Sequence, residues 1–325
     1  MSTRTPTRTA PETPLHDCRR AYAATLTDIA RADERLVIVT NDSIGSSNLG
    51  GFHEELPSRL INVGIAEQNQ VGVAAGLENG GKIPVVSCAG SFLSARATEQ
   101  IKIDAAYSHR HMLLCAQSPG LAYGPLGSTH HSAEDVSIMR AIPDMTVIVP
   151  ADPAETAGAV HWAYSELDGP AYIRVSRMKA PAIHGEDYVF TPEAVTVRDG
   201  ADLTIIANGT ALHRAIEAAD RLAADGVRAR LLSIPVVKPL DEDAVLAAAR
   251  ETGRIITVEE GAVKGGLGGA VAELTADRCP VPVRRLGVPD EFAPTGSEAW
   301  LMDHWGVSAE GVIAAARGLM AQPVA

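Results

Sequence analysis

The sequence is poor in several features that mark common protein classes. Aromatic residues make up only 4% of its 325 residues, and no apolar run is long enough to cross a bilayer, so a membrane-spanning protein is not expected. Lys and Arg number 28 against 40 Asp and Glu, and they form no stripe. The resulting net charge of −12 disfavours nucleic acid and anionic membranes as partners.

Several short motifs are also missing. No G-x-G-x-x-G follows a strand pattern, and neither a Walker loop nor a G-x-S-x-G elbow occurs, which disfavours dinucleotide enzymes, P-loop NTPases and α/β-hydrolases. The glycine cluster at 265–269 is better explained as a tight turn before a helix than as a phosphate loop. The 4 cysteines form no Cys-x-x-Cys pair, so neither a zinc site nor a disulfide framework is indicated.

The first 14 residues are rich in Thr, Pro and Arg and contain no apolar block. They lack the apolar centre of a secretory signal, and we expect a disordered tail, with an organelle transit peptide as the alternative. Widely separated cysteines next to apolar runs are typical of small buried side chains in a reducing compartment. We therefore expect a soluble protein of the cytoplasm.

From Leu15 onward, short runs rich in Val and Ile alternate with longer helical patterns. Several of the short runs are apolar at consecutive positions, as in strands buried on both faces. The strands are expected at Leu36–Thr40, Leu60–Val63, Ile83–Cys88, Met112–Ala116, Thr146–Val149 and Ala171–Val175. The helices are expected at Arg20–Ala30, Glu67–Asn79, Ala95–Tyr107, Ser132–Arg140 and Pro153–Glu166. This alternation predicts a mainly parallel sheet between two layers of helices.

A stretch with two prolines and several charges interrupts this rhythm, after which the alternation begins again. We expect strands at Leu203–Ala207, Ala229–Ser233 and Arg254–Val258, and helices at Thr210–Ala224 and Asp241–Glu251. Asp241 is a good N-cap for the last helix, and Gly253 a good stop. The prediction is an α/β protein of two three-layer α/β/α domains, at 15–180 and 196–325, joined by a linker at 181–195.

Polar residues stand where three strands of the first domain should end. Glu67 begins a helix after one strand, Phe92 follows a second, and His130 lies in a loop before a helix. Taken singly, these are most simply a helix-dipole carboxylate, a core aromatic and a solvated histidine. Because the carboxyl ends of parallel strands open onto one edge of the sheet, the three side chains are expected to converge on one crevice.

The order of these segments resembles the pyrimidine-binding domain of transketolases, and it is most similar to the split enzymes in which two polypeptides replace one. The segments are Asn62–Asn69 (NVGIAEQN), Ala89–Leu93 (AGSFL), Ser128–His131 (STHH) and Val147–Asp152 (VIVPAD). The second domain joins the resemblance through Val237–Leu240 (VKPL), Val258–Glu260 (VEE) and Gly265–Gly268 (GGLG). The resemblance covers residues from about Leu15 to Gly318.

The resemblance implies thiamine diphosphate as cofactor. Glu67 would hydrogen-bond N1′ of the aminopyrimidine ring and so favour the imino form that acts as the internal base. Phe92 would stack on that ring, with Asp42 nearby, and His130 would exchange a proton with a substrate oxygen. Two further aromatic positions of the family's pocket read Ala95 and Thr98 here, so this part of the cofactor site departs from the pattern.

The family's sugar-phosphate site is matched by Arg19, Ser46 and Arg177, with His131 beside the substrate. Arginine suits phosphate because its planar fork donates two parallel hydrogen bonds. Two departures stand out: the family's acidic residue for a donor hydroxyl falls on Leu126, and its second substrate histidine falls on Ser118. Since a leucine accepts no hydrogen bond, a modified or more apolar substrate is indicated.

The family binds Mg²⁺ and the cofactor diphosphate through a Gly-Asp-Gly motif, and no Gly-Asp-Gly occurs in this chain. The resemblance therefore implies that no metal ligand lies here and that a partner subunit supplies the diphosphate site, in an α2β2 assembly.

The prediction is a transketolase subunit that moves a two-carbon ketol unit from a ketose phosphate to an aldehyde or an atypical acceptor. Three alternatives remain open. They are a 2-oxo-acid dehydrogenase E1 β-like subunit, a deoxyxylulose-phosphate synthase-like carboligase and a non-catalytic scaffold.

Overall fold

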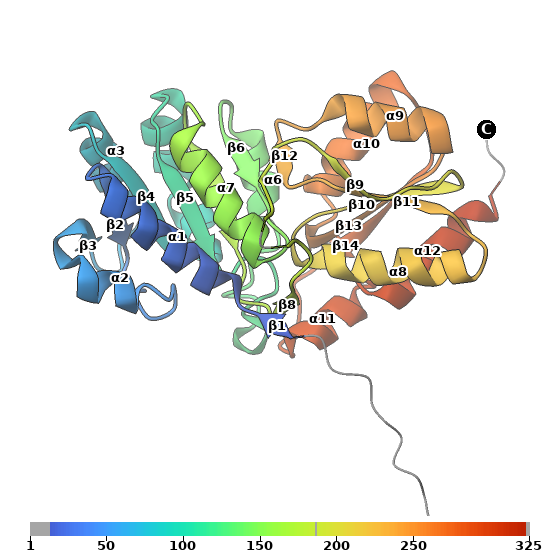
Figure 1. The fold of residues 1–325 in the computed structure, drawn as a ribbon, viewed down its shortest axis with the longest axis horizontal. Coiled ribbons are helices and arrows are strands. Elements are labelled where there is room, and N and C mark those ends of the chain that lie inside the picture. The colour runs from blue at the N-terminus through green and yellow to red at the C-terminus, as the bar shows by residue number, and fades with distance from the viewer. Residues whose placement is uncertain (1–13, 186, 323–325) are drawn as a thin grey trace, which may run out of the picture.

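The chain folds around two β-sheets that lie side by side, each between layers of helices (Figure 1). The computed structural model describes residues 14–185 and 187–322. The predicted α/β class with mainly parallel sheets is confirmed. The expected tail falls almost wholly on residues 1–13, which lie outside the described residues.

The first sheet has seven strands in the order β12-β6-β7-β5-β4-β2-β3. Six of them are parallel: β2 (Leu36–Thr40), β3 (Leu60–Asn62), β4 (Ile83–Ala89), β5 (Leu113–Gln117), β6 (Thr146–Ile148) and β7 (Ala171–Val175). The edge strand β12 (Val236–Lys238) runs antiparallel to β6 and comes from far along the chain. Val236 pairs with Ile148, so part of the predicted second domain completes the sheet of the first.

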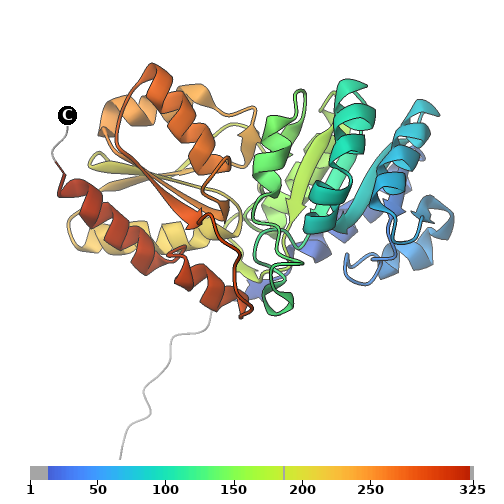
Figure 2. The same cartoon turned by 180° about the vertical axis from the view of Figure 1, so that it is seen from behind.

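Helices cover both faces of the first sheet. One face carries α1 (Cys18–Ala32) and α7 (Pro153–Ser165), which are prominent in Figure 1. The other face, seen in Figure 2, carries α3 (Glu67–Asn79), α4 (Gly90–Arg96), α5 (Thr98–Gln100), η2 (Ile101–Tyr107) and α6 (Asp135–Ala141). The short elements α2 (Gly50–Glu55), η1 (Pro57–Arg59) and η3 (Gly124–Leu126) complete this half. A two-stranded ribbon of β1 (Leu15–His16) and β8 (Ala180–Pro181) lies beside it.

The second sheet has the order β14-β13-β10-β11-β9. Its strands are β9 (Val195–Arg198), β10 (Leu203–Ala207), β11 (Ala229–Ser233), β13 (Ile255–Ala262) and β14 (Val283–Val288), and only β9 is antiparallel. Its helices are α8 (Leu212–Ala224), α9 (Glu242–Thr252), α10 (Leu267–Arg278), α11 (Glu298–His304) and α12 (Ala309–Met320), with η4 (Gly209–Ala211) ahead of α8.

Three apolar clusters hold these layers together. One lies between α1, α7 and the first sheet, and another between α8, α12 and the second sheet. The third is shared: Leu93 and Met139 from the first half pack in one cluster with Val245 and Leu267 from the second. Because this core runs across the junction, the two halves form one packed body.

Most predicted strands and helices are found within one or two residues of their expected bounds. Asp241 accepts a hydrogen bond from the Ala244 backbone N, and Gly253 adopts a left-handed conformation at the end of α9, as predicted. Gly265, with φ of +78°, forms the predicted turn ahead of α10.

One helix prediction is wrong. The expected helix Ala95–Tyr107 is divided into α4, α5 and η2, because α4 already begins at Gly90 and Ala97 leaves the helical conformation. The helix expected at Ser132–Arg140 begins only at Asp135. The expected boundary at 181–195 stays a prediction; β8 and β9 occupy its two ends.

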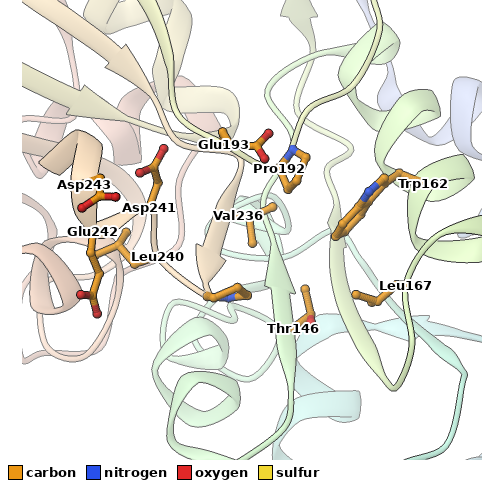
Figure 3. A pocket seen from close by; sticks show the side chains of 11 residues that line it. Thr146, Trp162, Leu167, Pro192, Glu193, Val236, Leu240, Asp241, Glu242 and Asp243 are labelled. Atoms are coloured by element: carbon orange, nitrogen blue, oxygen red, sulfur yellow. The ribbon is translucent and has the colours of Figure 1, made fainter.

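A hollow of about 570 Å³ lies at the junction between the two sheets (Figure 3). Trp162, Leu167 and Val236 form its apolar wall. Two of its carboxylates have partners: Asp241 caps α9 and accepts the Ala194 backbone N–H at 3.0 Å, and Glu242 pairs with Arg278. None of the helices within the described ranges could span a membrane.

Candidate active site

The parallel strands β2, β3, β4 and β5 bring the predicted polar residues to one edge of the first sheet. A hollow of about 250 Å³ opens there. Its lining is Asn41, Asp42, Ser43, Ser46, Ile65, Glu67, Ala89, Phe92, Tyr123, Leu126 and His130. Six predicted site residues, Asp42, Ser46, Glu67, Phe92, Leu126 and His130, thus share one hollow, which brings together Glu67, Phe92 and His130 as expected.

Glu67 lies at the start of α3, after a turn in which Gly64 has φ of +73°. Its side chain is only 3% exposed, yet it faces both this hollow and an adjoining one. The Asn41 side-chain amide donates to Glu67 Oε1 at 2.8 Å. Arg96 Nη1 donates to both carboxylate oxygens, at 3.1 and 3.0 Å. Glu67 is therefore a carboxylate with a fixed orientation at the wall of a cavity.

The pKa of Glu67 lies below its ordinary value. Burial alone raises the pKa of this carboxyl, but hydrogen bonds from its own backbone, Asn41 and Arg96, together with the charge of Arg96, outweigh that effect. Glu67 is accordingly ionised near neutral pH, and an ionised carboxylate accepts hydrogen bonds without donating one.

Aromatic rings form the other side of the hollow. The Phe92 and His130 rings meet edge to face with centroids 5.2 Å apart, and Tyr123 and His130 meet in the same way at 5.7 Å. The Arg96 guanidinium carbon lies 4.2 Å from the Phe92 ring centroid. These contacts fix the His130 ring between two aromatic side chains and place it across the hollow from Glu67.

Two of the three residues expected to bind phosphate are in direct contact, and the third packs on a neighbouring ring. Arg19 Nη1 donates to the Ser46 backbone oxygen at 2.8 Å, so these two residues are adjacent. Arg19 also pairs with Asp17 through its Nε, at 3.0 Å from Oδ1. Arg177 is not among the lining residues but packs on one of them, with its guanidinium carbon 4.7 Å from the Tyr123 ring centroid.

Four other predicted site residues do not line the hollow. Ser118 is fully buried and has φ of +54°, and its hydroxyl has no hydrogen-bond partner among the described residues. His131 is buried, its Nε2 donates to the Gly124 backbone oxygen at 3.2 Å, and burial lowers its pKa. Ala95 is exposed, and the Thr98 hydroxyl donates to the Ser94 backbone oxygen.

Sequence reasoning missed the three residues that shape the site most closely, Asn41, Arg96 and Tyr123. One signal was available for Arg96, because it follows Phe92 by four positions and so lies on the same helix face. Asn41 and Tyr123 are brought in by the tertiary structure, and no local pattern marks them.

Possible metal ligands are numerous in the sequence, with 40 Asp and Glu and 10 His, but the described structure does not group them. Within residues 14–185 and 187–322, no three His, Cys, Asp or Glu side chains are grouped so that they could hold a metal ion.

Comparison with known proteins identifies two family domains. The transketolase pyrimidine-binding domain matches residues 16–182, and the transketolase C-terminal domain matches residues 192–312. Both parts of the predicted resemblance are therefore confirmed.

Individual relatives agree. An apulose-4-phosphate transketolase subunit of Phocaeicola vulgatus is 41% identical over 297 residues, which cover 91% of this chain and 95% of that protein. The 6-deoxy-6-sulfo-D-fructose transketolase subunit SqwH of a Clostridium species is 40% identical, covering 93% and 94%. A 1-deoxy-D-xylulose-5-phosphate synthase of Syntrophotalea carbinolica is 37% identical, but only 47% of its length is covered.

Among solved structures, an inactive beta4 tetramer of a split-gene transketolase superposes with a TM-score of 0.85 at 36% identity, covering 95% of this chain and 99% of that one. The matches thus favour the predicted transketolase subunit over the synthase alternative. The family implies dependence on thiamine diphosphate, and the split relatives imply a partner subunit. This chain belongs to the transketolase family.

Proposed function

We propose that this chain is the subunit of a split transketolase that binds the aminopyrimidine end of thiamine diphosphate and the substrate. The observation that carries the proposal is the buried Glu67 carboxylate, held by Asn41 and Arg96 in a hollow that also contains Phe92 and His130. When bound, thiamine diphosphate supplies the nucleophilic ring carbon on which ketol transfer depends.

The residues of the hollow fit a flat heteroaromatic ring. Glu67 offers an ionised acceptor for a ring N–H, and Phe92 offers an aromatic face. Asp42 lines the rim of the hollow, and its backbone N–H donates to Asn62 Oδ1 at 2.9 Å. In this proposal it borders the cofactor end of the hollow. Ala95 and Thr98 lie outside the lining and take no part in this proposal.

His130 is the proton-transfer group of the proposal. Its ring is fixed by Phe92 and Tyr123, and its Nδ1 lies 3.0 Å from the Thr129 hydroxyl, which orients the imidazole. A histidine so placed can exchange a proton with a substrate oxygen.

Residues at the mouth of the hollow would determine which substrate is bound. Arg19, Ser46 and Arg177 would bind a terminal anion. The apulose-4-phosphate and sulfofructose enzymes are named for sugars that carry such an anion, a phosphate in one and a sulfonate in the other. Leu126 lines the hollow and is 52% exposed, so this position offers an apolar contact where a carboxylate would bind a hydroxyl. We propose an anionic ketose donor that lacks, or does not use, a hydroxyl at that point.

A partner subunit completes the proposed site. Because this chain has no Gly-Asp-Gly motif and no metal-ligand group among its described residues, the partner would hold Mg²⁺ and the diphosphate in an α2β2 assembly of carbohydrate metabolism. Ile65, at the hollow, is 76% exposed, which is typical of a surface that another chain covers. The similar split-gene transketolase is inactive as a beta4 tetramer, which also supports the need for a partner. The 4 cysteines are free, which is typical of a reducing compartment, so we place the subunit in the cytoplasm.

Calorimetric titration tests this proposal. Thiamine diphosphate with Mg²⁺ is titrated into the co-expressed pair, into this chain alone, and into a pair carrying Glu67→Ala. We expect binding by the pair, weaker binding or none by the single chain, and at least tenfold weaker binding by the Glu67→Ala pair, in line with the loss of a charge-assisted hydrogen bond.

The matched control is Glu78→Gln, a change on the same helix whose carboxylate pairs with Arg110 far from the hollow. This variant should bind like the unmodified pair. A pair that binds no thiamine diphosphate would refute the proposal.

A further inference from the structure

One loop carries much of the substrate side of the hollow. Between β5 and α6, residues 119–131 present Tyr123, Leu126 and His130 to the cavity. Gly120 and Ser132 exchange backbone hydrogen bonds of 3.1 and 2.7 Å, which close the two ends of the loop against each other. We call residues 119–131 the substrate loop. Its conformation decides where His130 stands.

A buried carboxylate from the C-terminal half holds the beginning of this loop. Glu260, on β13, is 4% exposed, and its Oε1 accepts the Leu121 backbone N–H at 2.8 Å. Its Oε2 accepts the Thr210 hydroxyl. The fit is tight, because a Cβ added at Gly120, where φ is +60°, would clash with Glu260 Oε1. Glu260 therefore lies against the backbone at the base of the substrate loop.

The C-terminal half also contacts the far part of the loop. The Ser128 hydroxyl donates to the Ala293 backbone oxygen at 2.7 Å, and the Gly296 N–H donates to the Gly124 backbone oxygen at 3.3 Å. A Cβ on Gly124 would clash with the Gly296 backbone oxygen. Residues 293–296 thus hold the loop from a second side.

We propose that the C-terminal half of this chain positions the active site, with Glu260 as a positioning residue that fixes the substrate loop and thereby the place of His130. This inference rests on the proposed function and assigns a task to a region that contributes no residue to the lining of the hollow. A buried carboxylate costs free energy, and an apolar side chain of similar volume is often the more stable choice. Only an acceptor, however, satisfies the Leu121 N–H.

Glu260 could instead serve only to join the two halves, and a kinetic comparison separates these roles. Glu260→Leu removes the acceptor, whereas Glu260→Gln keeps an oxygen for Leu121 and gives the Thr210 hydroxyl a donor to accept from. Thr252→Val is the matched control: this buried threonine of the C-terminal half bonds Thr204 at 2.9 Å and has no contact with the loop.

Two measurements are made on each variant. Hydrogen–deuterium exchange of residues 119–131 is followed in the full chain, and kcat and KM are determined in the co-expressed pair. For Glu260→Leu we expect faster loop exchange and a kcat/KM lower by about tenfold or more, because small displacements of a reacting group are costly. In Glu260→Gln, the loop exchange rate and kcat/KM should both stay near those of the unmodified chain. Thr252→Val should lower the melting temperature and change neither.

Loop exchange and kcat/KM that stay unchanged in Glu260→Leu would overturn the inference, as would an equal change in Thr252→Val. Thiamine diphosphate binding should persist in Glu260→Leu, since Glu67 and Phe92 do not lie on the loop. Failure of the inference is therefore distinguishable from failure of the proposed function, which the binding titration measures independently of these variants.

Discussion

Glu67 and Glu260 are both almost inaccessible to solvent, at 3% and 4%, but their surroundings differ. Glu67 faces two hollows and has Arg96 against its oxygens, and the pKa of its carboxyl is lowered. Glu260 borders a space of only about 10 Å³ and has a backbone N–H and a hydroxyl as partners. Burial raises the pKa of Glu260.

The difference teaches that exposure alone does not separate a ligand-binding carboxylate from a structural one. Glu67 can gain a further partner from the hollow, whereas the space beside Glu260, of about 10 Å³, is too small for a ligand. The first is equipped to meet a ligand and the second to hold a loop. The predictions below, together with the Glu67 and Glu260 variants, test this distinction.

The largest expected effect on stability comes from Arg174→Met. Arg174 Nε donates to both Asp135 oxygens at 3.1 Å, and the two side chains are 5% and 0% exposed. Removing one partner of a buried pair leaves the other uncompensated and costs about 3–5 kcal/mol. The free energy of unfolding from urea titration should fall by that amount.

The double variant Arg174→Met with Asp135→Leu serves as the control. It should recover part of the lost free energy, because position 135 then no longer carries a buried carboxylate without its cation. An Arg174→Met variant as stable as the unmodified chain would contradict the importance of this pair. It would also show that the charge of Arg174 is not needed to offset the burial of Glu260.

Leu126→Asp should have an intermediate effect, on specificity and not on stability. The side chain lines the hollow and is half exposed, so a carboxylate there remains solvated and can accept a hydroxyl hydrogen bond. We expect the ratio of kcat/KM between a hydroxylated ketose phosphate and its deoxy analogue to rise about tenfold. Val189→Asp, the same kind of change at an exposed apolar position outside the lining of the hollow, is the control and should leave the ratio unchanged. An unaltered ratio in Leu126→Asp would show that the donor does not approach this wall.

Arg96→Met should have the smallest effect and should depend on pH. Because the pKa of Glu67 is lowered in the folded chain, ionised Glu67 contributes stability that is present above its unfolded pKa and is lost as pH falls through the lower, folded value. Removing Arg96 raises the folded pKa, so the loss should begin at a higher pH. The Arg96 side chain is 51% exposed, so the change should be roughly 0–1 kcal/mol.

Circular dichroism between pH 7 and the acid transition measures this shift. Lys82→Met, at an exposed cation that bonds the Glu34 backbone oxygen and not a carboxylate, is the control and should leave the acid midpoint in place. An Arg96→Met midpoint at lower pH than that of the unmodified chain would contradict the assigned electrostatics.

Local patterns in the sequence predicted much of the fold. The helix Glu67–Asn79 and the strands Ala171–Val175 and Leu203–Ala207 have the expected bounds. These segments are long or continuously apolar, so their periodicity or composition decides their structure. β12 was not predicted, because three residues become a strand only through pairing with β6, which lies far away in the sequence.

The site was predictable to a similar degree. Parallel strand order was enough to bring Glu67, Phe92 and His130 together. The loop contacts of Glu260 and the partners of Glu67 depend on tertiary packing, which no local pattern reports. Ser118 was expected beside the substrate, but the left-handed backbone after β5 places it in the interior.

Turnover of an anionic ketose by the co-expressed pair, with and without Glu67→Ala, tests the central claim most directly. Loss of the carboxylate should lower kcat by about a hundredfold or more, because it acts on the reacting centre. The Glu78→Gln pair should keep its activity. Unchanged turnover in the Glu67→Ala pair would contradict the account, and this chain would then serve its partner as a scaffold.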